Sequence, residues 1–198
     1  MPNGANQFRH EGEAIKDIYR GALVRLSAIV PEELAKSNIK WKRDSEAQRL
    51  GTLFPIQMLS EKKYKEDLEK REENENAFRF AIRTLVDDVF IGTCSFWIEQ
   101  WSHGDAWLGI FIGERDYWGK GYGTDATRLL VSYGFNELNF RRISLGLHAF
   151  NERALKSYLK VGFTLEGRER GAFLRDGIRY DGFLMGLLRE EWLARQSI

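Results

Sequence analysis

The most informative segment of the chain is Asp116-Tyr-Trp-Gly-Lys-Gly-Tyr-Gly-Thr-Asp-Ala-Thr-Arg-Leu-Leu130, because alternating glycines lead directly into an amphipathic helix. Gly119, Gly121 and Gly123 can adopt backbone angles closed to other residues, so successive N–H groups can converge on one anion. The helix that follows adds the positive end of its dipole. Upstream, residues 107–113 form an apolar run of strand type. The pattern predicts a strand, a phosphate-binding glycine loop and a helix.

Two familiar phosphate loops do not fit this segment. A P-loop needs Gly-x-x-x-x-Gly-Lys-Ser/Thr, and here Gly121 follows Gly119-Lys120, which leaves no hydroxyl for magnesium. A dinucleotide fingerprint needs Gly-x-Gly-x-x-Gly and an acid about 20 residues further on. The glycine spacing differs, and the nearest acid, Glu137, lies inside a helical pattern. A glycine-rich turn without a ligand is the structural alternative for this segment alone.

Composition favours one globular domain. The chain has 198 residues, 43% of them hydrophobic, which is enough to bury about 70% of the unfolded surface. Lys and Arg number 30 against 29 Asp and Glu, so nothing in the charge suggests nucleic acid or a membrane surface as a partner. The longest uncharged apolar stretch, residues 89–98, is too short to span a bilayer, and no signal-peptide pattern opens the chain, so we expect a cytoplasmic protein. Cys94, inside a strand pattern, is expected to fill the core rather than act as a nucleophile.

Periodicity and turn residues predict the order of the elements. Residues 1–20 are polar and aperiodic and are expected to form a flexible arm, followed by a single domain over residues 21–198. Within the domain we expect strands at 22–29, 77–86, 89–100, 107–113, 142–150, 163–174 and 178–188, and helices after Pro31, from Ser60 to about Glu73, after the glycine loop and from Asn151 to Gly162. Asp87-Asp88 and Asp176-Gly177 are hairpin signals.

The glycine loop resembles the pyrophosphate loop of the GNAT superfamily of N-acetyltransferases, whose pattern Arg/Gln-x-x-Gly-x-Gly/Ala corresponds to residues 118–123. Trp118 replaces the usual first residue, a departure that is familiar in the RimJ/RimL-like branch. A second GNAT motif, Asn-x-x-Ala-x-x-x-Tyr-x-x-x-Gly-Phe, matches residues 151–163 in type and spacing. The closing residues 176–181 and Glu191-Trp192 also look RimJ/RimL-like. The resemblance covers about residues 23–192.

The resemblance implies an α+β fold with α/β/α layers. Its mixed, mostly antiparallel seven-stranded sheet would splay between the fourth and fifth strands, with about four helices. It also implies acetyl-CoA as co-substrate, with no metal, and a pantetheine arm that enters the splay like an extra strand. The pyrophosphate would be held mainly by main-chain N–H groups. The cofactor-binding residues implied are Phe111, Ile112, Trp118, Gly119, Lys120, Gly121, Tyr122, Gly123, Thr124, Asn151 and Ala154.

Acetyl transfer to an amine needs a proton donor for the departing thiolate, and the second motif points to Tyr158. A phenol, with a reference pKa of about 10, is protonated at pH 7 and can donate to a thiolate. Its alternative is a core tyrosine on the helix stripe. For the general base, His148 near the end of the fifth strand is a candidate, with Glu114 and bulk water as alternatives.

The acceptor is less clearly indicated. The resemblance implies a primary amine, namely a protein N-terminal amine, a polyamine, an aminoglycoside or another small amine, and a monomer or homodimer. Trp41, Phe54, Tyr64 and Trp101 are candidates to line the acceptor site, although each could instead belong to the core or rim. Two readings from other classes stay open, a non-catalytic acyl-CoA-binding module and a nucleotide-binding interaction protein.

Overall fold

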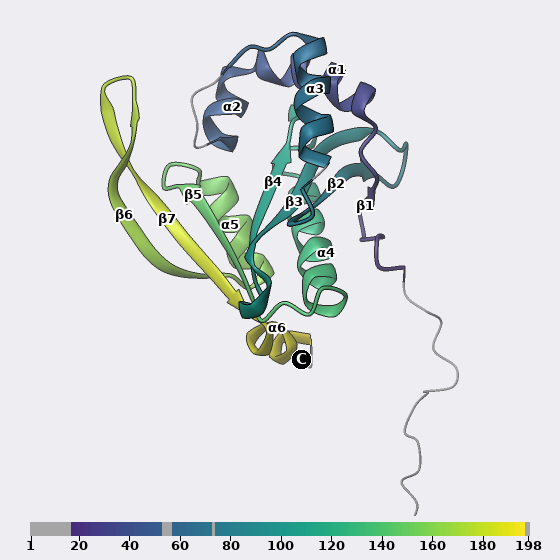
Figure 1. Cartoon of the computed structure of the whole chain (residues 1–198). Helices are drawn as coiled ribbons and strands as arrows, with labels where there is room; N and C mark the ends of the chain where they lie inside the picture. Colours follow the sequence, from purple (N-terminus) through teal and green to yellow (C-terminus); the bar gives the residue numbers. More distant parts are fainter. Residues whose placement is uncertain (1–16, 53–56, 73, 197–198) are drawn as a thin grey trace, which may run out of the picture.

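The computed structural model describes residues 17–52, 57–72 and 74–196 (Figure 1). Residues 1–16 of the expected arm lie outside the described residues, and Arg20 forms an isolated bridge with Arg25. The elements are β1 (Val24–Ser27), α1 (Pro31–Lys42), α2 (Ser45–Gly51), α3 (Glu61–Glu72), β2 (Ala77–Thr84), β3 (Phe90–Gln100), the 3-10 helix η1 (Trp101–His103), β4 (Asp105–Ile112), the 3-10 helix η2 (Arg115–Tyr117), α4 (Tyr122–Asn136), β5 (Arg142–His148), α5 (Glu152–Val161), β6 (Thr164–Arg175), β7 (Ile178–Leu188) and α6 (Arg189–Gln196).

Local sequence explains where most helices begin and end. Pro31 opens α1 at a position that needs no N–H donor, and the side chain of Asn151 caps α5 by accepting from Ala154 N at 3.1 Å. Two helices were not expected from the sequence, α2 and α6. α2 has only 7 residues, too few to show a helical period, and is started by a cap from Asp44. No helix in the described part of the chain is long and apolar enough to cross a membrane.

The strands form one seven-stranded sheet in the order β1-β2-β3-β4-β5-β7-β6. All neighbours are antiparallel except β4 and β5, whose parallel pairing covers only Asp105–Arg142, Ala106–Ile143 and Trp107–Ser144. Beyond these pairs the two strands separate, as Figure 1 shows between the labels β4 and β5. The expected fold, with its splay between the fourth and fifth strands, is therefore confirmed.

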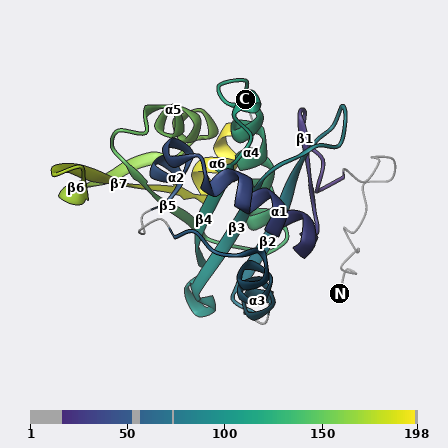
Figure 2. The ribbon, with the colours of Figure 1, turned by 90° about the horizontal axis from the view of Figure 1, so that it is seen from above.

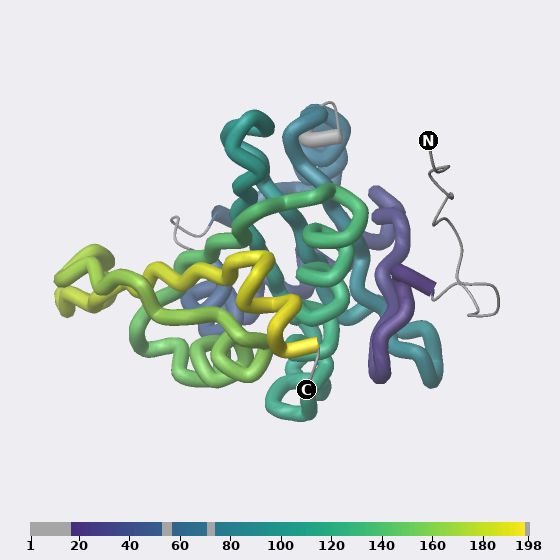
Figure 3. Tube along the Cα trace, turned by 90° about the horizontal axis from the view of Figure 1, so that it is seen from below, coloured from purple at the N-terminus to yellow at the C-terminus, as the bar shows by residue number. Residues whose placement is uncertain are grey.

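Helices cover both faces of the sheet, which gives the expected α/β/α layers (Figure 2). α4 and α5 pack beside each other on one face, over a core that includes Phe96, Phe135 and Phe140. On the other face α1 buries Leu34 and Trp41 against the sheet. The C-terminal α6 lies beside α4 (Figure 3), where Trp192 packs against Phe135 with ring centroids 5.3 Å apart. Cys94 is fully inside the core, so burial raises its pKa and it is no nucleophile.

Candidate active site

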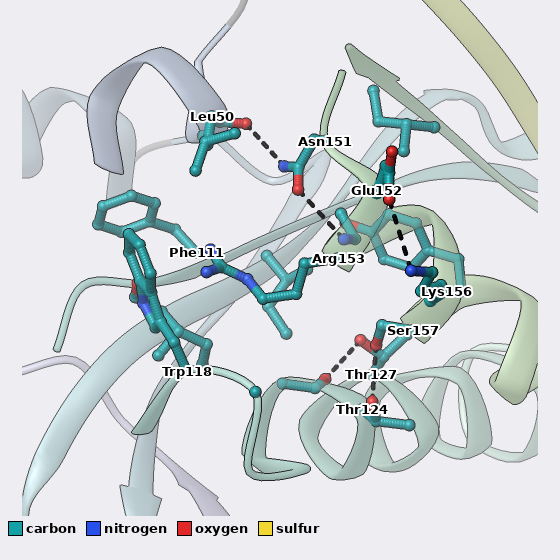
Figure 4. A pocket seen from close by; sticks show the side chains of 18 of the residues that line it. Leu50, Phe111, Trp118, Thr124, Thr127, Asn151, Glu152, Arg153, Lys156 and Ser157 are labelled. Atoms are coloured by element: carbon teal, nitrogen blue, oxygen red, sulfur yellow. Dashed lines mark hydrogen bonds and ion pairs between the residues drawn. The ribbon is translucent and has the colours of Figure 1, made fainter. Parts of the chain in front are cut away.

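The separation of β4 from β5 opens into a cleft of about 680 Å³. Its walls are β4 from Leu108 to Ile112 and β5 from Gly146 to His148, and α2, the glycine loop, α4 and α5 close its ends. Figure 4 shows side chains from these elements converging on one space. Because the edge of β4 beyond Trp107 has no partner strand on this side, its main-chain groups can pair with an extended ligand.

The glycine loop forms one end of the cleft. Gly119 and Gly121 have left-handed φ angles of +71° and +94°, and both line the cleft. The first bond inside α4 runs from Asp125 N to Gly121 O at 2.9 Å, so the amides just before Asp125 start the helix without an intrahelical acceptor. Such amides favour an anion. Gly123 does not need its special freedom, since its φ is not positive and an added Cβ would only touch Ile112 at 3.5 Å.

A stacked pair of side chains spans the cleft above this loop. Trp118 is fixed by donating from Nε1 to Ile112 O at 2.8 Å, and the Arg153 guanidinium lies 3.8 Å from the centroid of its ring. In Figure 4 Arg153 reaches from α5 across the cleft toward Trp118. Burial lowers the pKa of Arg153, although Glu46 opposes the shift. Arg115 approaches the same ring at 5.1 Å but is itself paired with Asp44.

The basic side of the cleft was missed by sequence reasoning. Arg153, Lys156 and Lys160 all line it from α5. Their spacing of three and four residues places them along one side of a helix, and this stripe was the available signal. Ser157 was also missed; its hydroxyl and that of Thr124 are 2.7 Å apart and tie α5 to the start of α4.

Asn151 links two walls of the cleft. Besides capping α5, it donates from Nδ2 to Leu50 O at 3.2 Å, at the end of α2. Phe111, Ile112 and Ala154, three further residues expected around the cofactor, also line the cleft. Of the remaining predictions, Trp118, Gly119, Gly121, Gly123 and Thr124 line it, whereas Lys120 is exposed outside it and Tyr122 packs edge-on against Tyr117 at 4.9 Å.

Tyr158 lies on the inner side of α5, where it lines the cleft and is only 8% exposed. Its ring meets Phe163 edge-on at 5.9 Å, so both the cleft and the core hold it. Burial raises its pKa to about 12, so the phenol is protonated at pH 7. A protonated hydroxyl beside the cleft is able to act as a proton donor.

His148 also lines the cleft but is enclosed. Its Nε2 lies 3.1 Å from Thr52 O, and since a carbonyl only accepts, Nε2 carries the hydrogen. Nδ1 is buried and has no hydrogen-bond partner. Burial, together with the charge of nearby Arg175, lowers the pKa of the imidazole, although the hydrogen bond to Thr52 has the opposite effect. The ring is therefore neutral at pH 7.

Glu114 has a structural place. Its carboxylate accepts from Lys40 Nζ at 2.6 and 2.7 Å and from Trp41 Nε1 at 2.9 Å. Burial alone would raise the pKa of the Glu114 carboxyl, but these hydrogen bonds lower it below its ordinary value. The ionised carboxylate therefore joins α1 to the end of β4 and is a poor proton acceptor.

The residues expected around the acceptor do not gather at the cleft. Trp41 is buried between Phe90 and Phe111. Tyr64 is buried on α3, and Trp101 lies beyond β3, where it donates to Asn76 Oδ1 at 2.8 Å. None of these three lines the cleft, and Phe54 lies outside the described residues.

The first turn of α4 is tied to β1. The Asp125 carboxylate accepts from the backbone N–H groups of Ala22 at 3.2 Å, Leu23 at 2.7 Å and Val24 at 3.1 Å. Leu23 in turn lies 3.3 Å from the position that a Cβ on Gly121 would take. The segment entering β1 thus supports the glycine loop from outside. Among the described residues, no group of three or more His, Cys, Asp or Glu side chains could hold a metal ion.

Comparison with known proteins points to one family. The profile of the acetyltransferase (GNAT) domain matches residues 24–164. The uncharacterised N-acetyltransferase p20 of Bacillus licheniformis is 34% identical over 116 residues, 59% of this chain and 65% of p20. The spermidine N(1)-acetyltransferase of Escherichia coli (strain K12) is 34% identical over 82 residues, 41% of this chain and 44% of that protein. The chain thus spans less than two thirds of the length of both relatives.

A solved structure supports the same fold. The spermidine N-acetyltransferase from Vibrio cholerae in complex with CoA and spermine superposes with a TM-score of 0.76 and 21% identity. The match covers 86% of this chain and 98% of that chain. At this identity the likeness is one of fold.

Proposed function

Because the chain belongs to the GNAT family of acetyltransferases, we propose that it transfers an acetyl group from acetyl-CoA to a primary amine by direct attack in a ternary complex. One observation carries the proposal: the gap between β4 and β5 leads into the same cleft that the glycine loop borders. A long cofactor with a thioester at one end and phosphates at the other requires that combination.

Acetyl-CoA is the co-substrate of this family, and the cleft supplies partners along its length. The amides of residues 119–124 are those available to the pyrophosphate, since the Trp118 N–H already donates to Arg115 O at 2.9 Å. Arg153, Lys156 and Lys160 add positive charge for its phosphates. The pantetheine arm lies along the unpaired edge of β4 near Phe111 and Ile112. Positioning of the thioester is the main task of the protein, since the cofactor brings its own reactive group.

The chemistry then needs few side chains. The amine nitrogen attacks the thioester carbonyl, whose developing negative charge is stabilised by a main-chain N–H of β4. The carbon–sulfur bond breaks as the tetrahedral intermediate collapses, and Tyr158 protonates the departing thiolate. The raised pKa of Tyr158, about 12, keeps it protonated for this step.

The proton that leaves the amine has two possible acceptors in this proposal. His148 is neutral at pH 7, but its free nitrogen, Nδ1, is buried and its Nε2 is engaged with Thr52 O. We therefore infer that His148 holds the Thr52 carbonyl in place and forms part of the cleft wall. Water is then the immediate proton acceptor. A direct role for His148 would require Nδ1 to become accessible when the acceptor binds.

The named relatives support amines as the acceptor class, since two of them are called spermidine acetyltransferases. Protein N-terminal amines, polyamines, aminoglycosides and other small amines are the candidates that the sequence resemblance raises. The test is thiol release from acetyl-CoA with a panel containing each of these amines. Release that depends on one amine, with an acetylated product in mass spectra, supports the proposal.

Two further measurements separate the alternatives. Acetyl-CoA should raise the melting temperature while ATP and NAD should not, because only a ligand of the native state stabilises it. Stabilisation by ATP or NAD instead would indicate a nucleotide-binding protein. Acetyl-CoA binding without thiol release for any amine would indicate a non-catalytic module. The affinity should be unchanged by EDTA, and a strict magnesium requirement would contradict the cradle of amides.

A further inference from the structure

Two glycines flank the point where β4 and β5 begin to separate (Figure 1). Gly109 and Gly146 each lie two residues beyond the last pair of the two strands, Trp107 and Ser144, so they share the sheet face of that pair. Both line the cleft, and both are exposed although each lies inside a strand. The cleft is therefore open to solvent between these two glycines.

Neither glycine is required by the backbone or by packing. Their φ angles are not positive, so another residue could adopt the same conformation. A Cβ on Gly146 would lie 3.9 Å from Phe183 O, an ordinary contact, and a Cβ on Gly109 would meet only the rotatable hydroxyl of Ser95 at 3.3 Å. The strand glycines that crowding does explain, with an added Cβ within 3.0 Å of a neighbouring atom, are Gly92, Gly182 and Gly186. A strand glycine without these causes, and away from a bulge, marks the close approach of a ligand.

The surroundings of the two glycines are covered. On the same face, Phe111 of β4 packs against α1, and His148 of β5 is buried. On the opposite face, Leu145 and Leu147 belong to the core under α4 and α5. The bare strip between the two glycines therefore joins the cleft to the face of the sheet that carries Trp107.

A second cavity adjoins the glycines on this face. Its volume is about 370 Å³, and both residues of the last pair, Trp107 and Ser144, line it. Leu184 of β7, the register partner of Gly146, lines it as well. A molecule in the second cavity can reach the cleft by extending one end past the last pair, over about 7 Å, the rise of two strand residues.

We propose that the amine acceptor reaches the thioester from this face, between Gly109 and Gly146, and that their missing side chains set the width of the entrance. The inference rests on the proposed acetyl transfer and assigns the route of its acceptor. With the phosphates at the glycine loop and the arm along β4, the thioester lies toward the narrow end of the cleft, beside the two glycines. The nitrogen attacks from the open face and loses a proton to water. The carbon–sulfur bond breaks, and Tyr158 of α5, beyond the opposite face, protonates the thiolate.

Labelling of introduced thiols tests the entrance, because Cys94, the only cysteine of the sequence, is buried. Gly146→Cys places a thiol at the entrance and Ser157→Cys places one beside Thr124, near the glycine loop. Ala172→Cys, at an exposed site of β6 that lines neither cavity, is the matched control. Each variant is treated with N-ethylmaleimide, with and without acetyl-CoA, and the adduct is measured by intact mass.

The two cleft positions should respond differently to the cofactor. With acetyl-CoA at about 100 times its Kd, labelling should fall roughly 100-fold in Ser157→Cys and change less than about two-fold in Gly146→Cys and Ala172→Cys. Protection of the thiol in Gly146→Cys would overturn the inference, because the arm or the acyl group would then fill that space. Continued labelling supports an entrance that stays open beside the bound cofactor.

Transfer activity completes the test. The maleimide adduct of Gly146→Cys should still gain melting temperature with acetyl-CoA but lose transfer to the best amine of the panel, whereas the adduct of Ala172→Cys should keep it. Without labelling, Gly146→Ala and Gly146→Val should lower kcat/KM in that order, by about ten-fold or more for Gly146→Val, with little change in the Kd for acetyl-CoA. Unchanged transfer by the Gly146→Cys adduct would overturn the entrance and leave acetyl transfer standing. The expected labelling without any acetylated product from the parent would support the opening and refute the proposed transfer.

Discussion

The guanidinium of Arg153 lies 3.8 Å from the centroid of the Trp118 ring, although the two residues belong to different elements and are far apart in sequence. Trp118 occupies the position at which the pyrophosphate loop of the family usually has Arg or Gln. The stack therefore places a cation from α5 above a loop whose own cation, Lys120, is exposed outside the cleft. A cation held on an aromatic face is ordered before the ligand arrives.

Replacing Arg153 tests this role. Arg153→Gln should raise the Kd for acetyl-CoA about ten-fold, since charge-assisted hydrogen bonds contribute roughly 1.5–3 kcal/mol, while kcat changes little. The dependence of affinity on salt should also weaken. The control is Arg128→Gln, an exposed arginine of α4 that does not line the cleft. Equal affinities for the parent and Arg153→Gln would contradict the assignment.

Gly119 and Gly177 form a matched pair for testing the glycine loop. Both have positive φ, +71° and +76°, and a Cβ at either would meet nothing within 4 Å. Alanine at either position should therefore cost about 1 kcal/mol of stability from backbone strain. Only Gly119→Ala should also weaken acetyl-CoA binding, because its methyl group points into space that the pyrophosphate needs. Comparable affinity losses in both variants would mean that the loop is not the cradle.

Removing the hydroxyl of Tyr158 should slow the reaction without disturbing the fold. Tyr158→Phe is expected to lower kcat about 100-fold or more for every acceptor, because protonation of the thiolate is common to all of them. Since burial raises its pKa to about 12, the parent should show no loss of kcat from this group below about pH 11. Tyr133→Phe, away from the cleft on α4, is the control. If Tyr158→Phe had the same kcat as the parent protein, Tyr158 would be a residue of the core with no part in catalysis.

Asp125 should affect both stability and cofactor affinity. Asp125→Asn replaces the carboxylate that accepts three backbone N–H groups of residues 22–24, which should lower the free energy of unfolding by about 2 kcal/mol. This corresponds to a fall of roughly 4–8 °C in Tm for a chain of this size. The Kd for acetyl-CoA should rise as well, because the start of α4 loses its outer support. Asp116→Asn, exposed in η2, should change neither quantity. A lower Tm with unchanged affinity would limit Asp125 to a structural role.

His148 gives the stability a dependence on pH. Burial lowers its pKa in the folded protein below the unfolded value of about 6.5, so the unfolded chain binds a proton first as the pH falls. The free energy of unfolding should be unaffected by this group above pH 6.5 and should decrease as the pH falls through its folded pKa. His148→Gln should flatten this part of the profile, whereas His103→Gln, at an exposed site, should leave it in place. Identical profiles in the parent and His148→Gln would exclude the effect.

Features that depend on neighbouring residues could be predicted from the sequence. Asn151 caps α5 through Ala154 N, and Gly162 ends the same helix with φ +120°, because both effects act within a few residues. The positive φ of Gly119 and Gly121 follows from the same local reasoning. The order of strands and the splay came instead from the resemblance of two motifs, not from the pattern of any single strand.

Features that depend on tertiary packing could not be predicted. Trp41 was a reasonable candidate for an acceptor site, but α1 turns its ring against Phe90 and Phe111, and Glu114 accepts its N–H. The stack of Arg153 on Trp118 likewise exists only because β5 brings α5 back beside the glycine loop. A single sequence shows that an aromatic or basic residue is present, but the partner that decides its role lies on another element.

The short pairing of β4 with β5 has a consequence for how the molecule holds together. With only the pairs at residues 105–107 and 142–144 joining them, the sheet consists of two separately hydrogen-bonded halves, β1 to β4 and β5 to β7. What joins the halves is therefore mainly a shared core, which includes Phe96 and Leu108 from one half and Leu145 and Met185 from the other. On the proposed function, a pantetheine arm along β4 and against α5 would add contacts between the two halves. The co-substrate would then also be a structural link across the sheet, and release of CoA would remove that link at the end of each cycle.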